Sequence, residues 1–177
     1  MAQGAEALVS FGLAGGLDPA LRPGVVIMPT EILCDDKLYA ADPMLAARFG
    51  GLTGHRLLAG TAIAADAATK RRLRLATHAH AIDLESGGVA ECAQAHGLGF
   101  VAVRAICDPA ERNLPPAALF ALDRRGGVAL PRVLLSLVRN PGQFAALAAL
   151  ACDAARARRA LIGLADRYRG AASRSSL

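Results

Sequence analysis

Tryptophan is absent from this 177-residue chain, and aromatic residues make up only 4% of it. Proteins that bind nucleic acid commonly combine a basic surface with stacking aromatic side chains or a known binding module, and no such module is recognisable here. The net charge of +5 therefore does not indicate a nucleic-acid partner. The basic residues gather in segments 70–74 and 156–174. We interpret both as solvated helix faces, and the C-terminal one secondly as a surface for anionic lipid headgroups.

Long apolar runs are also missing. Hydrophobic residues make up 54% of the chain, but charges interrupt every run before the roughly 18 residues that a transmembrane helix needs. The start Met-Ala-Gln-Gly-Ala-Glu lacks the basic and apolar regions of a signal peptide. The four cysteines form no Cys-x-x-Cys pair, and we expect them to be buried free thiols in a reducing compartment. We therefore expect a cytoplasmic protein, with membrane association through the C-terminal helix left open.

The order of apolar segments indicates an α/β domain. Apolar runs of strand length alternate with helical periodicity, which is typical of a three-layer α/β/α fold with a mostly parallel or mixed central sheet. We expect one domain over residues 1–169 and a disordered tail over 170–177. The expected strands are 7–13, 25–30, 56–63, 79–84 and 99–106, and the expected helices are 43–49, 67–77, 85–96, 116–122, 130–138 and 142–168. An apolar stripe should pack the last helix on the sheet: Phe144, Leu147, Leu150, Ala151, Ala154, Ala157, Leu161 and Leu164.

Two carboxylates follow predicted strands. Glu85 should lie in the first turn of the helix after strand 79–84, and Asp108 follows closely on strand 99–106 and stands at its end. Ligands bind at strand ends in open α/β sheets. Glu85 at a helix start would stay anionic and accept two hydrogen bonds from vicinal hydroxyls, as in a ribose, although it could be an ordinary helix-start acid. A partly buried Asp108 could have a raised pKa suited to donating a proton, and a simple Asp-Pro turn is the alternative.

Three further features surround this pair. Arg104 lies within an otherwise apolar strand that should be buried, so it needs a counter-ion, which we expect to be Glu85 or Asp108. Arg104 then either orients the site or forms a plain structural ion pair. Asp83 is interpreted as an ordinary helix-start acid. His78 and His80 share one strand face but lack a third ligand, so we expect no metal.

A glycine-rich segment, 12–16, follows the first strand. Small residues there allow backbone N–H groups to approach an anion or a sugar, or merely form a tight turn. It does not match Gly-x-Gly-x-x-Gly, so a dinucleotide site is disfavoured.

Taken together, these segments resemble the superfamily of purine nucleoside phosphorylases and 5'-methylthioadenosine/S-adenosylhomocysteine nucleosidases. The motifs are Asp-Leu-Glu-Ser-Gly-Gly-Val-Ala from Asp83, Arg-Ala-Ile-Cys-Asp from Arg104 and Gly-Leu-Ala-Gly-Gly-Leu-Asp-Pro from Gly12. The Leu-Asp-Pro ending, the run 108–116 and Arg139-Asn140-Pro141 are similar to the hopanoid-associated phosphorylase branch. The resemblance covers about residues 7–161 and begins in the middle of the family domain, so we expect an N-terminally shortened relative.

The resemblance implies cleavage of the N-glycosidic bond of an adenosine-like nucleoside, specifically adenosylhopane, by phosphorolysis or hydrolysis. It implies no cofactor, inorganic phosphate as a possible co-substrate, and a homo-oligomer. The resemblance further implies that Asp108 protonates the purine at N7, that Glu85 holds the ribose, and that Arg104 orients the two acids. It also assigns lining residues: Gly12, Leu13, Ala14 and Gly15 near the ribose and the phosphate or water, and Leu84 and Cys107 in the pocket wall. Leu13 stands where relatives often carry a hydroxyl residue, which fits an apolar 5' region. Because relatives have a strand and a phosphate loop before this segment, a catalytically inactive nucleoside-binding or partner protein is the alternative.

Overall fold

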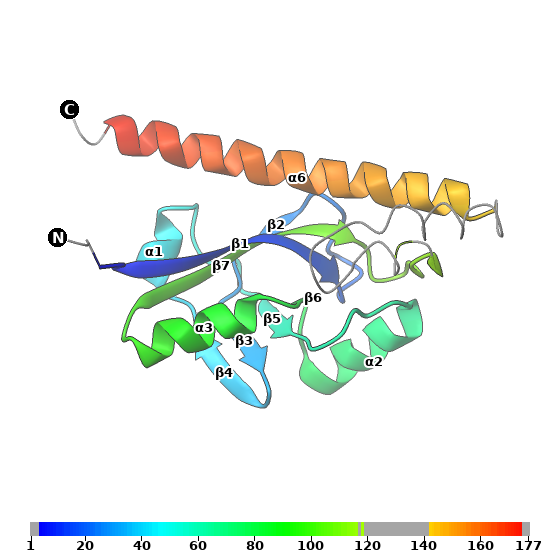
Figure 1. The fold of residues 1–177 in the computed structure, drawn as a ribbon, viewed down its shortest axis with the longest axis horizontal. Helices are drawn as coiled ribbons and strands as arrows, with labels where there is room; N and C mark the ends of the chain where they lie inside the picture. Colours follow the sequence, from blue (N-terminus) through cyan, green and yellow to red (C-terminus); the bar gives the residue numbers. More distant parts are fainter. Residues whose placement is uncertain (1–3, 117, 119–141, 175–177) are drawn as a thin grey trace.

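The structure, a computed structural model, describes residues 4–116, 118 and 142–174. A mixed sheet of seven strands forms its centre, in the order β2-β7-β1-β6-β5-β3-β4. Helix α6 runs across one side of this sheet, and helix α3 lies on the other side (Figure 1). The α/β class and the layered arrangement expected from the sequence are confirmed, and the sheet is mixed.

The centre of the sheet is a long parallel pair. Strands β1 (Ala7–Gly16) and β7 (Gly99–Asp108) are parallel and in continuous register from Ala7↔Gly99 to Ala14↔Ile106, after which the register shifts and Gly15 pairs with Asp108. Strand β2 (Val26–Ile27) pairs with the other edge of β7, while β6 (Ala81–Asp83) meets β1 only at the C-terminal end of β1. Strand β5 (Arg56–Ala59) runs parallel to β6. All five strands expected from apolar runs are present, although β1 and β7 are longer than expected and the other three are shorter.

A hairpin that the sequence analysis missed completes the sheet. Strands β3 (Glu31–Cys34) and β4 (Lys37–Ala40) are antiparallel and joined by Asp35 and Asp36. Both aspartates have positive φ, 43° and 60°, as a tight two-residue hairpin turn requires. Aspartate tolerates this conformation better than most residues, but Asp-Asp is a weaker turn signal than Asn-Gly or Asp-Gly.

The described helices begin and end close to the expected positions. They are α1 (Pro43–Ala47), α2 (Ala67–Thr77), α3 (Ser86–Ala95) and α6 (Gln143–Arg174). Helix α2 begins after Asp66, whose carboxylate accepts the Thr69 N–H, and ends at His78, which has φ of 55°. Helix α6 continues to Arg174, into the segment 170–177 that was expected to be a tail. Residues 119–141, with the expected helix 130–138 and most of 116–122, lie outside the described residues.

Helix α6 packs on the sheet through only part of the expected stripe. Ala157, Leu161 and Leu164 are buried in a cluster with Val103 and Ala105 of β7. Phe144, by contrast, is 69% exposed. Its inclusion in the stripe was wrong, because the first turn of α6 extends beyond the ends of β1 and β7 (Figure 1). No helix in the described part of the chain combines the length and apolar character needed to cross a bilayer.

The cysteines are free but not all buried. Cys34 and Cys107 are partly buried, whereas Cys92 on α3 and Cys152 on α6 are exposed. The expectation of burial was therefore wrong for the two helical cysteines. An α-helix has 3.6 residues per turn, so the apolar residues next to these cysteines in sequence lie partly on the other face of the helix and do not bury the thiol.

Candidate functional site

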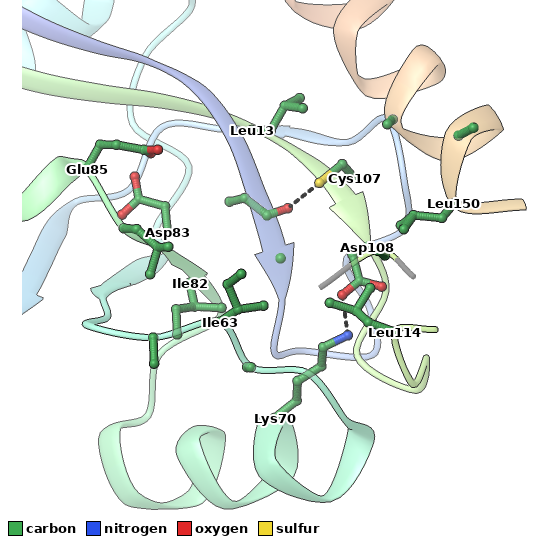
Figure 2. A pocket seen from close by; sticks show the side chains of 18 of the residues that line it. Leu13, Ile63, Lys70, Ile82, Asp83, Glu85, Cys107, Asp108, Leu114 and Leu150 are labelled. Carbon is green, nitrogen blue, oxygen red and sulfur yellow. Dashed lines mark hydrogen bonds and ion pairs between the residues drawn. The ribbon is translucent and has the colours of Figure 1, made fainter. Parts of the chain in front are cut away.

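A cavity of about 440 Å³ lies where β1, β6 and β7 end, and Figure 2 shows its lining side chains. Glu85 and Asp108 both line it, although they come from different elements. The parallel pairing of β1 and β7 places Gly15 opposite Asp108. The cavity thus forms where ligands bind in α/β sheets, at the carboxyl ends of strands.

Asp108 is presented to the cavity by an irregularity at the end of β7. The register with β1 shifts between Ala14 and Gly15, so that Cys107 is skipped. Consecutive side chains of a regular strand point to opposite faces, whereas Cys107 and Asp108 both line the cavity. Asp108 is 6% exposed, and its Oδ1 atom is buried without a hydrogen-bond partner in the described part of the chain. Burial raises the pKa of Asp108, against the opposing effect of Lys70.

Lys70 of α2 is the partner of Asp108, and the sequence analysis missed it. It was interpreted as part of a solvated basic run, yet it is only 1% exposed. Its ammonium group donates to Asp108 Oδ2 and to the carbonyl oxygens of Pro109 (2.9 Å) and Arg112 (3.0 Å). A sequence signal existed: Lys70 precedes Leu73 by three residues, so both lie on the α2 face that packs on the core.

Glu85 lies at the N-cap of α3, one position before the helical turn in which it was expected. Its side chain is 75% exposed and makes no capping hydrogen bond. Asp83 acts as the cap instead, because its carboxylate accepts the Ser86 N–H (3.2 Å) and hydroxyl (2.6 Å). Glu85 Oε2 lies 4.0 Å from Arg104 Nη2, so the carboxylate faces the cavity with a cation behind it.

Arg104 is buried, as its place in the strand predicted, and its main counter-ion is Asp83, which the sequence analysis did not consider, while the expected partner Glu85 lies at the limit of ion-pair distance. Arg104 Nε donates to Asp83 Oδ2 at 2.5 Å, and Nη2 donates to Ser10 Oγ at 2.6 Å and Ser86 Oγ at 2.9 Å. Asp83 is therefore no ordinary helix-start acid. It is 5% exposed and joins β7 to the start of α3. Arg104 does not line the cavity, and its Nη2 atom lies 4.0 Å from Glu85 Oε2, at the upper limit for an ion pair.

The glycine-rich segment divides between two roles. Leu13, Ala14 and Gly15 line the cavity, but Gly12 does not. A Cβ atom on Gly12 would lie 3.0 Å from Arg104 Nη1. Gly12 thus leaves room for the arginine and not for a ligand.

The two residues expected in the pocket wall both line the cavity, Leu84 half-exposed and Cys107 partly buried. The Cys107 thiol donates to the carbonyl of Ala14 at 3.5 Å. Burial raises the pKa of Cys107 to about 11, which keeps the thiol protonated at neutral pH. Cys107 is thus suited to packing and not to nucleophilic attack.

The side of the cavity nearest α6 is apolar. Four residues of α6 line it together with Leu13 and Leu114: Leu147, Leu150, Ala151 and Ala154. Figure 2 shows the polar side chains in two places, with Glu85 and Asp83 on one side and Asp108 beside Leu114 and Leu150 on the other. The cavity can therefore hold a largely apolar ligand that has polar groups at two places.

The two histidines considered as metal ligands serve other purposes. His78 ends α2, and His80 Nδ1 accepts the Arg56 N–H at 3.0 Å. Among the described residues, no group of three histidine, cysteine or acidic side chains is placed to hold a metal.

No family model and no curated protein matches this chain in sequence. Solved structures do match its fold. Futalosine hydrolase of Helicobacter pylori aligns with a TM-score of 0.60 at 16% identity, over 93% of this chain and 69% of that one. The 5'-methylthioadenosine/S-adenosylhomocysteine nucleosidase of Campylobacter jejuni gives 0.58 at 20% identity, over 75% and 64%. The S-adenosylhomocysteine nucleosidase of Streptococcus pyogenes, solved with 5-methylthiotubericidin, gives 0.54 at 22%, over 60% and 56%. The chain thus spans less than two thirds of the last two enzymes, and its fold is that of these nucleosidases.

Proposed function

We propose that this protein cleaves the N-glycosidic bond of an adenosine-like nucleoside and releases adenine. One observation carries the proposal: Glu85 and Asp108, which resemble the ribose-binding and proton-donating acids of the nucleosidase superfamily, line one cavity at the ends of β6 and β7. The likeness of fold to nucleosidases supports it.

Asp108 has the properties of a general acid. Its burial raises its pKa, which favours the protonated carboxyl, and its Oδ1 accepts no hydrogen bond from any residue that the structure describes. A purine leaves more readily as a neutral base than as an anion. As the bond between C1' and N9 breaks, the electron pair stays with the base, and N7 takes the proton from Asp108.

Glu85 is suited to hold the ribose. Its carboxylate is exposed at the cavity and free of a capping hydrogen bond, so both oxygens can accept from the 2' and 3' hydroxyls. Arg104 Nη2 lies 4.0 Å from Glu85 Oε2, behind the carboxylate.

The apolar side of the cavity supports a large apolar 5' substituent. Leu13, Leu147 and Leu150 would contact it, which agrees with adenosylhopane as substrate and with a role in hopanoid biosynthesis. The ribosyl acceptor is water or inorganic phosphate. We further propose that the chain forms a homo-oligomer and that exposed arginines of α6, such as Arg158 and Arg159, contact anionic membrane surfaces.

The test is incubation of the purified protein with adenosines that carry 5' groups of increasing apolar size. Chromatography detects adenine, and the second product separates hydrolysis, which gives the 5'-substituted ribose, from phosphorolysis, which gives its 1-phosphate. Adenine release that rises with 5' size is the expected result. Nucleoside binding without adenine release, measured by calorimetry, would instead identify an inactive nucleoside-binding protein and overturn the enzymatic proposal.

A further inference from the structure

Lys70 and Asp108 form a buried ion pair at the cavity, and the proposed cleavage gives a role to Asp108 but none to Lys70. An ammonium group has three N–H donors. In Lys70 they go to Asp108 Oδ2 and to two carbonyls of the segment after β7, those of Pro109 and Arg112. One side chain of α2 therefore fixes both the carboxyl group and the backbone that follows it.

The two carboxyl oxygens of Asp108 have different surroundings. Oδ2 is occupied by Lys70, while Oδ1 is buried and has no partner in the described residues. A buried oxygen without a hydrogen bond is costly, so Oδ1 is the atom available to a ligand N–H or to a transferable proton. Rotation of the carboxyl group would break the bond to Lys70.

We infer that Lys70 is a positioning residue for Asp108: it holds the carboxyl group with Oδ1 toward the ligand and stabilises the carboxylate that remains after the proton is given to the purine. The inference rests on the proposed function for the identity of the proton acceptor. In the step itself, Asp108 starts as the acid and ends as a carboxylate, the proton moves from Oδ1 to the purine N7, and Lys70 transfers no proton.

The electrostatic balance supports this role. Burial raises the pKa of Asp108, and the hydrogen bond and charge of Lys70 oppose that rise. Two other charged groups act on Asp108: Arg112, which lowers its pKa, and Asp153 of α6, which raises it. Those two form their own ion pair at 2.7 Å, so their effects on Asp108 oppose each other. Lys70 is the cation in hydrogen-bond contact with Asp108.

The test uses Lys70→Met, which preserves much of the side-chain volume and removes the charge. Arg71→Met is the matched control, since Arg71 is exposed on the same helix. Lys70→Gln serves as a second variant if Lys70→Met does not fold. We expect kcat for adenine release to fall about 10-fold or more, with a smaller change in KM. The alkaline limb of the kcat–pH profile should move to higher pH in Lys70→Met, because loss of the ammonium group raises the pKa of Asp108.

A double-mutant cycle separates positioning from a general structural effect. If Lys70 acts through Asp108, then adding Lys70→Met to Asp108→Asn should lower kcat no further. An equal loss in both backgrounds, or an unmoved pH limb, overturns the inference.

A measurement without turnover keeps the two proposals distinguishable. The carboxyl carbon of Asp108 can be titrated by NMR in the wild type and in Lys70→Met, with Asp108→Asn to assign the signal. If the wild type releases no adenine, the proposed function fails, and the titration alone decides the role of Lys70. An upward movement of the Asp108 pKa in Lys70→Met supports the inference, and an unchanged pKa overturns it.

Discussion

Asp83 and Arg104 form a buried ion pair, with Asp83 Oδ2 at 2.5 Å from Arg104 Nε. The pair joins the start of α3 to the centre of β7, and the hydroxyls of Ser10 and Ser86 satisfy Nη2 of the guanidinium. Both acids of the Asp-Leu-Glu motif line the cavity, but their surroundings differ. Asp83 is buried against Arg104, whereas the Glu85 side chain is 75% exposed and lies 4.0 Å from Arg104 Nη2.

Breaking this pair should destabilise the fold. Arg104→Met leaves Asp83 buried without its cation, and such a loss typically lowers the free energy of unfolding by about 3–5 kcal/mol. Arg22→Met removes the exposed ion pair with Glu111 and should cost less than about 1 kcal/mol. Urea denaturation of both variants measures the difference. Similar losses in the two would contradict the structural role of Arg104.

Asp108→Asn should lower kcat by roughly 100-fold or more, because the amide cannot give up a proton to the purine. Substrate binding should change less. Steady-state measurement of adenine release gives kcat and KM, and circular dichroism checks that the variant folds. Near-wild-type turnover would remove Asp108 from the mechanism.

Glu85→Gln should affect ribosides far more than 2'-deoxyribosides. In the proposed complex the carboxylate accepts charged hydrogen bonds from two hydroxyls, and the deoxy substrate lacks one of them. The informative quantity is the ratio of kcat/KM for each pair of substrates in wild type and variant. An equal loss for both substrates would argue that Glu85 acts on the fold of α3 and not on the sugar.

Leu150→Asn should reduce the preference for large apolar 5' groups. Leu150 lines the apolar side of the cavity, and a polar side chain there is expected to lower kcat/KM for long 5'-alkyl adenosines by about 10-fold or more, with adenosine itself little changed. Leu75→Asn provides a control, since Leu75 is 67% exposed on α2. Unchanged relative rates across the substrate series would place the 5' group elsewhere.

Thiol labelling should follow exposure and pKa. Cys92 and Cys152 are exposed and should react with iodoacetamide within minutes at pH 8, while Cys107, with a pKa of about 11, should stay unmodified in the native protein. Mass spectrometry of tryptic peptides identifies the modified residues. A bound nucleoside should leave Cys92 labelling unchanged, because Cys92 does not line the cavity.

The apolar runs and helical periods of the sequence predicted the fold class, five strands and the extent of α2. These are local signals, because one strand or one helix face is encoded within a short segment. The hairpin β3-β4 was missed because its Asp35-Asp36 turn carries a weak sequence signal. The motifs around Glu85 and Asp108 identified two acids, and the mixed sheet, in which β1 lies between β6 and β7, brings both to the cavity.

Only the tertiary structure decided how the charges pair. Lys70, in a run of basic residues, is buried against Asp108, while Arg104 is in direct contact with Asp83 and reaches Glu85 only at 4.0 Å. Each partner lies 21 or 38 residues away in the chain. Ion pairing depends on the distance between side chains in space and on their burial, and neither quantity is encoded in local composition. The sequence thus determined which residues can do the chemistry, and the packing of α2 and α3 on the strand ends determined which of them meet.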